Sequence, residues 1–191
     1  MSDFLMSCSC RGRRPKHVAS SATHSRPHLI ADLLRSRDVA RFLVAPTGFG
    51  KSTVAAEYAQ VVFSFRQTFW VNCESPCFLR DLDAGIIASR VAEIGGAGSL
   101  VVFDALPRMD ASRVEVFSEV VDELLAAGSE VLVTCTPTCD AYSDLHRDRV
   151  KLSARRFLLT DDEMKRSVRA TDSPHAKCRA ACVAWGSDDG G

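Results

Sequence analysis

The sequence lacks an excess of charge of either sign. Its 24 Lys and Arg residues equal its 24 Asp and Glu residues, so the formal net charge is zero. A balanced chain creates no global field that would attract nucleic acid or a membrane surface. The sequence also lacks an apolar run that approaches the ~20 residues a membrane span requires. We therefore expect no membrane insertion and no direct binding of nucleic acid.

The start of the chain lacks the order of a secretory signal. The stretch MSDFLMSCSCRGRR has a short apolar patch before its arginines, whereas a signal places charge first and then a longer apolar core. We therefore expect a cytoplasmic protein. The basic cluster CRGRRPKH is typical of a solvated tail, and contact with nucleic acid or acidic lipid is the alternative.

Cysteine, in contrast, is plentiful, with eight residues that should be mostly reduced in the cytosol. Structural zinc sites usually have two residues between paired ligands, so that the ligands are three positions apart. The cysteines of each pair here are four positions apart. Two of these cysteines also end predicted strands, where buried thiols are common. We favour reduced thiols, with zinc as the alternative. The pairs are Cys73 and Cys77, Cys135 and Cys139, and Cys178 and Cys182.

Strand-like and helix-like segments alternate along most of the chain. Residues 1–25 are rich in Ser, Arg and Cys without periodicity, which predicts a disordered leader. An amphipathic helix is predicted over 26–38, with its apolar face made by Leu29, Ile30, Leu33 and Leu34. Strands are predicted over 41–45, 68–73, 99–106, 130–136 and 150–159, and further helices over 51–62, 76–94, 112–128 and 160–170.

This alternation predicts the fold class. Continuous apolar strands separated by helices indicate a parallel sheet covered on both faces. We expect an α/β fold with a doubly wound, mostly parallel five-stranded sheet in three αβα layers. The expected organisation is a leader over 1–25, one domain over 26–170 and a tail over 171–191.

The stretch FLVAPTGFGKSTVAAEYA contains the pattern of a phosphate-binding loop between a strand and a helix. Such a loop wraps phosphate with backbone N–H groups, which requires little side-chain bulk and positive φ, hence Gly48 and Gly50. The helix that follows points its positive end at the phosphate. Lys51 would reach the β- and γ-phosphates, and Ser52 would place its hydroxyl on Mg²⁺.

The pattern departs from its usual form in one position, because it opens with Ala45 instead of glycine. A methyl group at the strand end does not touch the inward-facing amides, so phosphate binding should survive. The expected cofactor-binding residues are Pro46, Thr47, Gly48, Phe49, Gly50, Lys51, Ser52 and Thr53.

An acidic residue follows at the end of the next buried strand. The run LVVFD places Asp104 at the carboxyl end of its strand, where an acid binds Mg²⁺ through the water shell of the ion. The alternative is an acid that caps the next helix. We expect Ser52 and Asp104 to hold the metal, and Lys51 and Asp104 to carry any catalysis.

These segments, together with SRPHLIADLL, TFWVNC, EVLVTCTP and ARRFLLTDDEM, resemble the nucleotide-binding part of STAND signal-transduction ATPases. The resemblance is to bacterial transcriptional activators of the maltose-regulator (LuxR-type) kind, over roughly residues 25–168. The loop of that family is typically Ala-Pro-Ala-Gly-Phe-Gly-Lys-Thr-Thr, with the same opening alanine. The resemblance implies ATP and Mg²⁺ as cofactors and a role as a regulatory switch. It also implies that Arg26 and Pro27 lie near the adenine.

The departures from this family concern hydrolysis. The family usually has a second acid directly after the first, where this sequence has Ala105, and a histidine two positions later, where it has Pro107. An arginine that follows the fourth strand of the family is replaced by Thr136. Groups of this kind are worth ~10³-fold or more in rate. We therefore expect nucleotide binding with weak or absent hydrolysis.

Three functions remain open from the sequence. The first is a Mg-ATP-binding switch whose output domain is missing or supplied by a protein partner, since no helical lid or DNA-binding segment fits after residue 170. The second is a competent ATPase or small phosphotransferase, for which Asp110, Glu74 and Asp140 are possible bases. The third is an interaction domain with a decayed loop. No guanine-reading motif is present, which favours ATP over GTP.

Overall fold

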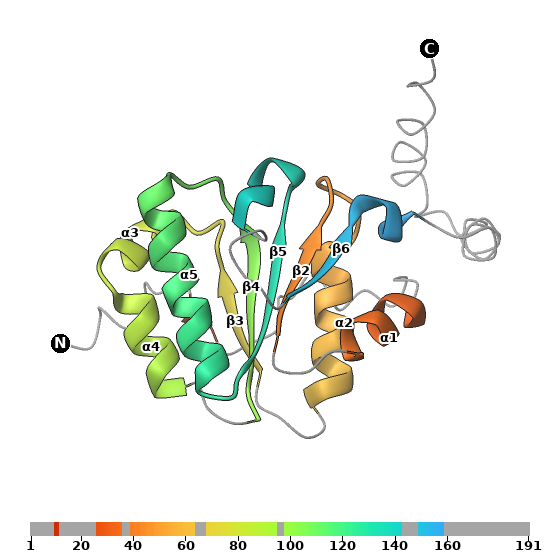
Figure 1. The fold of residues 1–191 in the computed structure, drawn as a ribbon, viewed down its shortest axis with the longest axis horizontal. Helices are drawn as coiled ribbons and strands as arrows, with labels where there is room; N and C mark the ends of the chain where they lie inside the picture. Colours follow the sequence, from red (N-terminus) through yellow and green to blue (C-terminus); the bar gives the residue numbers. More distant parts are fainter. Residues whose placement is uncertain are drawn as a thin grey trace, which may run out of the picture. The chain divides into compact units, whose positions relative to one another are not determined.

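A six-stranded sheet forms the centre of the described structure (Figure 1). The computed structural model describes residues 10–11, 26–35, 39–63, 68–94, 98–142 and 149–158. All of these except Leu158 belong to one unit, Met1–Phe157, and a second unit is formed by Leu158–Gly191. The predicted leader apart from Cys10 and Arg11, the predicted helix over 160–170 and the predicted tail over 171–191 lie outside the described residues.

The strand order is β1-β3-β4-β5-β2-β6, and every neighbouring pair is parallel except β1 with β3. The predicted sheet of five parallel strands is therefore confirmed, and β1 adds a two-residue antiparallel strand at one edge. The bounds are β1 Cys10–Arg11, β2 Ala40–Val44, β3 Thr68–Asn72, β4 Leu100–Leu106, β5 Glu130–Cys135 and β6 Arg149–Ser153.

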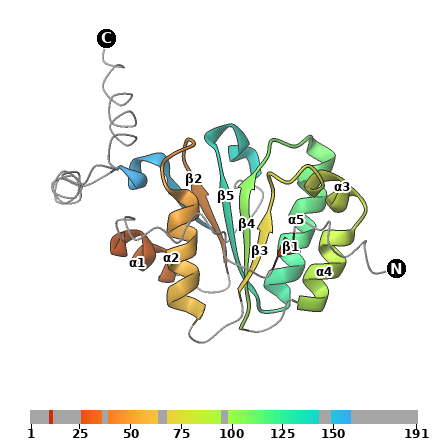
Figure 2. The ribbon, with the colours of Figure 1, turned by 180° about the vertical axis from the view of Figure 1, so that it is seen from behind.

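Helices cover both faces of this sheet, which confirms the three-layer arrangement (Figures 1 and 2). One face packs against α3 (Phe78–Asp83), α4 (Ile86–Ile94) and α5 (Ala111–Ala126), and the other against α1 (Pro27–Leu34) and α2 (Lys51–Phe63). The strands alternate between these two cores, and because both faces are buried, the strands are apolar throughout.

The path of the chain through the sheet brings the carboxyl ends of three strands together. The chain leaves β2, crosses to β3 at the far side, and returns through β4 and β5 to lie beside β2 again. Because the five strands are parallel, the carboxyl ends of β4, β5 and β2 are neighbours at one edge. Open α/β sheets bind their ligands at such a point.

Some element boundaries were predicted incorrectly. The helix expected over 76–94 divides into α3 and α4 at Gly85, which has φ +67° and so leaves the helical conformation. The strand expected over 150–159 ends at Ser153 and is followed by the 3₁₀ turn η4 (Ala154–Phe157). A second 3₁₀ segment, η3 (Pro137–Tyr142), follows β5 and was not predicted.

The apolar face of α1 is also narrower than predicted. Leu29, Ile30 and Leu33 are buried, whereas Leu34 is 47% exposed. At 3.6 residues per turn, Leu34 lies about 140° around the helix from Leu29, at the margin of the buried stripe.

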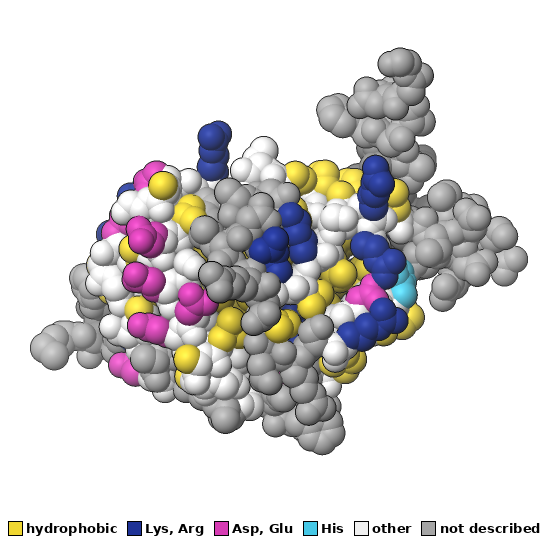
Figure 3. Space-filling view, viewed as in Figure 1, with side chains coloured by type: hydrophobic (Ala, Val, Ile, Leu, Met, Phe, Trp, Pro, Cys, Tyr) yellow, Lys and Arg dark blue, Asp and Glu magenta, His cyan; other side chains and the backbone are white. Residues whose placement is uncertain are grey.

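Charge is segregated on the surface although the net charge is zero. Figure 3 shows acidic side chains gathered over α5, and basic side chains over β6, η4 and α1. Exposed members are Glu115, Glu119, Asp122 and Glu123 on the first side, and Arg35, Arg149, Arg155 and Arg156 on the second. Among the described residues, none of the helices has both the length and the apolar character of a membrane span.

Candidate functional site

The loop between β2 and α2 follows the carboxyl end of β2, at the edge of the sheet where the ends of β4 and β5 also lie. Gly48 and Gly50 have φ of +89° and +80°, which is the left-handed conformation expected from the sequence. A Cβ built on Gly50 would meet nothing within 4 Å, so the backbone conformation and not a lack of space requires glycine there. Val54 N–H donates to Gly50 O at 3.0 Å and opens the hydrogen-bond ladder of α2. This is the strand–loop–helix unit of a P-loop NTPase-like fold.

The unusual opening residue of the loop is part of the core. Ala45 is fully buried and belongs to the hydrophobic cluster beneath α1 and α2. Its N–H donates to Cys135 O at 3.3 Å, which extends the pairing of β2 with β5 by one residue. The methyl group of Ala45 therefore packs into the core, which explains how alanine is accommodated at the start of the loop.

Lys51 begins α2 and reaches back across the loop. Its Nζ donates to the carbonyl oxygens of Ala45 at 2.7 Å and Pro46 at 2.9 Å. Burial lowers the pKa of Lys51 from its ordinary value, and negative charge at Cys135, Asp104 and Glu74 opposes that shift. The ammonium group is thus partly desolvated and held against two carbonyl oxygens at the start of the loop.

Asp104, at the carboxyl end of β4, meets the loop directly. Ser52 Oγ donates to Asp104 Oδ1 at 2.8 Å, although the two residues are far apart in sequence. Thr134 on β5 donates to the same Oδ1 at 2.7 Å. Asp104 is only 8% exposed, and its carbonyl oxygen accepts from Cys73 N–H at 2.9 Å. The predicted pair of metal-binding residues is therefore in contact.

The second carboxylate oxygen of Asp104 has a different environment. Within the described part of the chain, Oδ1 receives both side-chain donors and Oδ2 receives none. Among those residues, the one fully buried side-chain oxygen or nitrogen without a partner is Thr68 Oγ1, so Asp104 Oδ2 retains contact with solvent. A carboxylate oxygen that faces solvent beside a phosphate-type loop can accept hydrogen bonds from the water shell of a Mg²⁺ ion.

The backbone next to Asp104 is irregular. Ala105 has φ +59°, and the pairing of β4 with β5 shifts between Phe103 and Leu106. Because of this bulge, Ala105 N–H donates to the hydroxyl of Thr134 at 2.7 Å instead of to a ladder carbonyl. Left-handed conformation at a residue other than glycine is a form of strain that gathers at functional sites.

The remaining predicted loop residues lie at or near the surface. Pro46 and Thr47 are exposed, as is Gly48, and Phe49 is half-buried against the core beneath α1 and α2. Thr53 lies half-buried in the first turn of α2. Within the loop, the Phe49 N–H donates to Pro46 O at 3.4 Å.

Arg26 connects this loop to two other segments. Its Nη1 donates to Phe49 O at 3.4 Å and to Phe157 O at 3.0 Å, and its N–H donates to Glu57 Oε2 at 3.1 Å. Pro27 follows at the first turn of α1, a favoured position for proline. The arginine therefore joins the phosphate-type loop, α2 and η4 at the start of α1.

The candidate bases of the phosphotransferase alternative have different positions. Asp110 caps α5, accepts from Arg113 N–H at 3.0 Å and pairs with the Arg113 guanidinium. Glu74 is exposed in the turn after β3, close enough to Lys51 to influence its pKa. The side chain of Asp140 lies outside the described structure.

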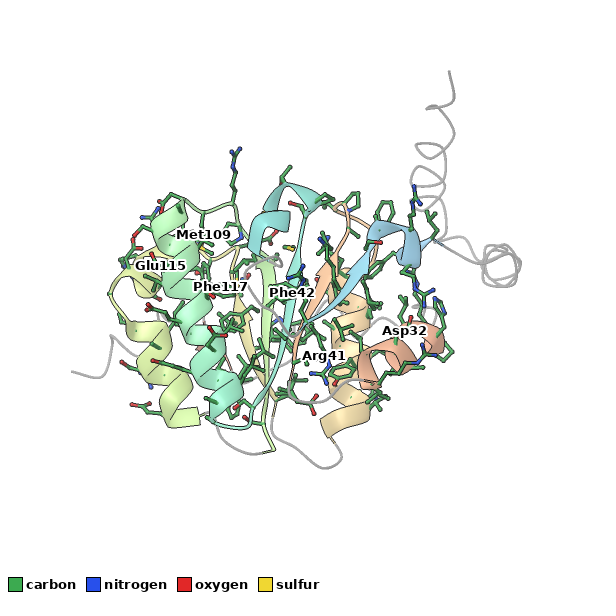
Figure 4. The ribbon with its side chains drawn as sticks, in the orientation of Figure 1. Asp32, Arg41, Phe42, Met109, Glu115 and Phe117 are labelled. Atoms are coloured by element: carbon green, nitrogen blue, oxygen red, sulfur yellow. The ribbon has the colours of Figure 1, made fainter. Side chains whose placement is uncertain are left out.

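A buried ionic cluster beneath α2 was missed by the sequence reasoning. Arg41 is 1% exposed, donates to Leu33 O at 2.9 Å and pairs with Glu130 at 3.4 Å, and Tyr58 donates to the same carboxylate at 2.5 Å. Figure 4 labels Arg41 beside Phe42 on β2, close to α1 and α2. The available signal was a charged residue near the start of each apolar strand, Arg41 in ARFLV and Glu130 in EVLVTC.

Thr134 was also missed as a site residue, although it lies in a run singled out for its lack of arginine. Its signal was a polar residue one position before the end of the strand EVLVTC.

The cysteine pairs gain no support as a zinc site. In the described residues, no group of three or more His, Cys, Asp or Glu side chains could hold a metal. Cys178 and Cys182 lie outside those residues.

Comparisons with known proteins add little to this geometry. No protein-family model and no curated protein matches the sequence. Among solved structures, C. elegans PCH-2 is similar at 12% identity and a TM-score of 0.42, over 67% of this chain and 41% of that one. Rhizobiales Trip13 is similar at 16% identity and a TM-score of 0.43, over 92% of this chain and 66% of that one. The chain thus spans part of the length of each, and likeness at this level carries no argument about function.

Proposed function

We propose that the chain is a Mg-ATP-binding P-loop domain that acts as a nucleotide-dependent regulatory switch with weak or absent hydrolysis. The observation that supports this best is the 2.8 Å contact between Ser52 and Asp104, made at the end of a loop whose two glycines have positive φ. A serine hydroxyl and a buried carboxylate placed beside an amide-lined loop have the chemistry required for a phosphate-bound Mg²⁺.

The division of work among the residues follows from their positions. The loop amides from Thr47 to Thr53 would receive phosphate oxygens, and the amino end of α2 would add its partial positive charge. Lys51 would exchange its bond to a loop carbonyl for a phosphate oxygen. Ser52 would turn its hydroxyl to Mg²⁺, and Asp104 would hold the water shell of the ion through Oδ2. Mg²⁺ would supply neutralisation of the phosphate charge.

Weak hydrolysis is proposed because two charged groups are absent where the resembling family has them. Ala105 carries no carboxylate that would orient water, and Thr136 carries no positive charge toward the γ-phosphate. Losing such groups typically costs ~10³-fold in rate. A domain that holds its nucleotide for long periods suits a switch more than a turnover enzyme.

The proposed biological setting follows from the resemblance to STAND ATPases. In that setting the output belongs to a protein partner or to a further domain, and the protein is cytoplasmic. ATP is proposed over GTP because the sequence has no guanine-reading motif.

Nucleotide binding is tested by calorimetric titration of ATP, ADP and GTP into the full chain with Mg²⁺. We expect ATP or ADP to bind more tightly than GTP, and Lys51→Ala to weaken binding by about 100-fold, since charge-assisted contacts to phosphate are lost. Lys151→Ala, on the edge strand β6, is the matched control and should bind as the wild type does. A wild-type chain that binds none of the three nucleotides would refute the proposal and leave the interaction-domain alternative.

Hydrolysis is tested separately by multiple-turnover kinetics with ATP. We expect less than about 10⁻² turnovers per second, in the range of slow switch proteins. A rate near one per second would instead support the competent ATPase or phosphotransferase. The binding result and the rate result are independent, so each part of the proposal can fail alone.

A further inference from the structure

Thr134 is a fully buried residue on β5. Its hydroxyl is hydrogen-bonded to the Asp104 carboxylate and to the backbone amide of Ala105 in the bulge. We propose that Thr134 is a positioning residue for Asp104: its hydroxyl holds Oδ1 so that Oδ2 faces the hydrated metal ion of a bound nucleotide. This inference rests on the proposed binding of Mg-ATP and adds a residue that sequence reasoning did not assign.

The direction of the hydrogen bonds is determined by their chemistry. Ala105 N–H has only a proton to give, so Thr134 Oγ1 must accept from it at 2.7 Å. The single proton of the hydroxyl is then directed to Asp104 Oδ1, also at 2.7 Å. The backbone amide thus sets the orientation of the hydroxyl, and the hydroxyl sets the orientation of the carboxylate.

The second donor to Oδ1 is not permanent in the proposed mechanism. Ser52 donates to Oδ1 at 2.8 Å. In the proposed function its hydroxyl would turn to Mg²⁺ when a nucleotide binds. Thr134 lies inside the sheet between two strands and has no such alternative. It therefore becomes the side-chain donor that keeps the carboxylate in place while the ion is bound.

The same contact links the strained backbone to the site. The bulge at Ala105 removes a ladder hydrogen bond from β4, and the Thr134 hydroxyl replaces it. A valine at position 134 would have the same shape but would leave Ala105 N–H unpaired and Asp104 without this donor. A serine would keep both hydrogen bonds and lose only a methyl group.

The test uses the full chain and ATP as the probe, titrated once with Mg²⁺ and once with EDTA. The measured quantity is the dissociation constant with EDTA divided by the dissociation constant with Mg²⁺. This ratio isolates the contribution of the metal to binding. We expect Thr134→Val to lower this ratio about tenfold, the size expected for one hydrogen bond to a charged group. Thr134→Ser should restore it to within about threefold. The matched control Thr68→Val makes the same substitution at the amino end of β3, the opposite end of the sheet from the site, and should leave the ratio unchanged.

The outcomes separate a positioning role from a structural one. If Thr134→Val weakens binding equally with Mg²⁺ and EDTA, or changes only the melting temperature, the positioning role is wrong. If Thr134→Val does not fold, Thr134→Cys, which keeps a weak donor, should have a ratio below that of Thr134→Ser, and equal ratios would overturn the inference. A wild type that binds ATP without any preference for Mg²⁺ also overturns it, while one that binds no nucleotide contradicts the proposed function itself.

Discussion

Replacing Ala105 with glycine tests the strained backbone beside the candidate site. Ala105 has φ +59°, a conformation that costs an L-residue roughly 1–2 kcal/mol and glycine almost nothing. Glycine also lowers the free energy of unfolding by about 0.4–1 kcal/mol, because it gives the unfolded chain more conformational freedom. It also removes a half-buried methyl group worth about 0.4 kcal/mol, half of a fully buried one. The expected net result is a gain of about 0.5 kcal/mol in the free energy of unfolding.

The matched control is Ala31→Gly, at an exposed position in the middle of α1. Glycine in a helix is less stable than alanine by about 1 kcal/mol, so this variant should be destabilised. The two variants make the same chemical change and should differ by about 1.5 kcal/mol with opposite signs, because one position is left-handed and the other helical.

The measurement is urea unfolding followed by circular dichroism, with thermal melting as a second readout. For a chain of this size, we expect the melting temperature to rise by about 1–2 °C in Ala105→Gly and to fall by about 2–4 °C in Ala31→Gly. If both variants lose the same amount of stability, Ala105 does not hold a left-handed conformation in solution, and the bulge that directs its N–H to Thr134 is wrong.

Three further predictions follow from the described contacts. Aspartate tolerates the left-handed conformation found at position 105, so Ala105→Asp adds a carboxylate there without new backbone strain. This variant should raise the single-turnover rate of ATP hydrolysis by about 10²-fold, whereas the uncharged Ala105→Asn should not. Arg113 holds the pKa of Asp83 below its ordinary value of 3.8, so this pair stabilises the fold above that pH and loses its effect as the pH falls through the depressed pKa; in Arg113→Met, carboxyl NMR should show the Asp83 pKa returning upward. Tyr58→Phe removes a donor to buried Glu130 and should lower the free energy of unfolding by about 1–3 kcal/mol, measured by urea unfolding. An unchanged free energy of unfolding would contradict this prediction.

Much of the fold could be predicted because its determinants are local and periodic. Continuous apolar strands between amphipathic helices predicted five parallel strands, and the glycine-rich loop predicted its own position between a strand and a helix. The pair formed by Ser52 and Asp104 was predicted from the rule that parallel strand ends meet at one edge.

The missed features have either an ambiguous local signal or a dependence on contacts between distant parts of the chain. The break at Gly85 was missed because an isolated glycine inside a helical pattern is often tolerated. The segregation of acidic and basic side chains on the surface was missed because a net charge of zero says nothing about their distribution. The ion pair of Arg156 with Asp32 on α1 was missed because it joins distant parts of the chain. The buried pairing of Arg41 with Glu130 likewise requires β2 and β5 to be adjacent.

The sequence by itself determined the alternation of strands and helices, the left-handed glycines of the loop and the chemistry of Lys51, Ser52 and Asp104. Only the tertiary structure decided that Thr134 on β5 would share the Asp104 carboxylate with Ser52, and that the Ala105 amide would orient the Thr134 hydroxyl. The physical reason is that local patterns specify the conformation of each segment, whereas the direction of a buried hydrogen bond depends on which strands lie side by side.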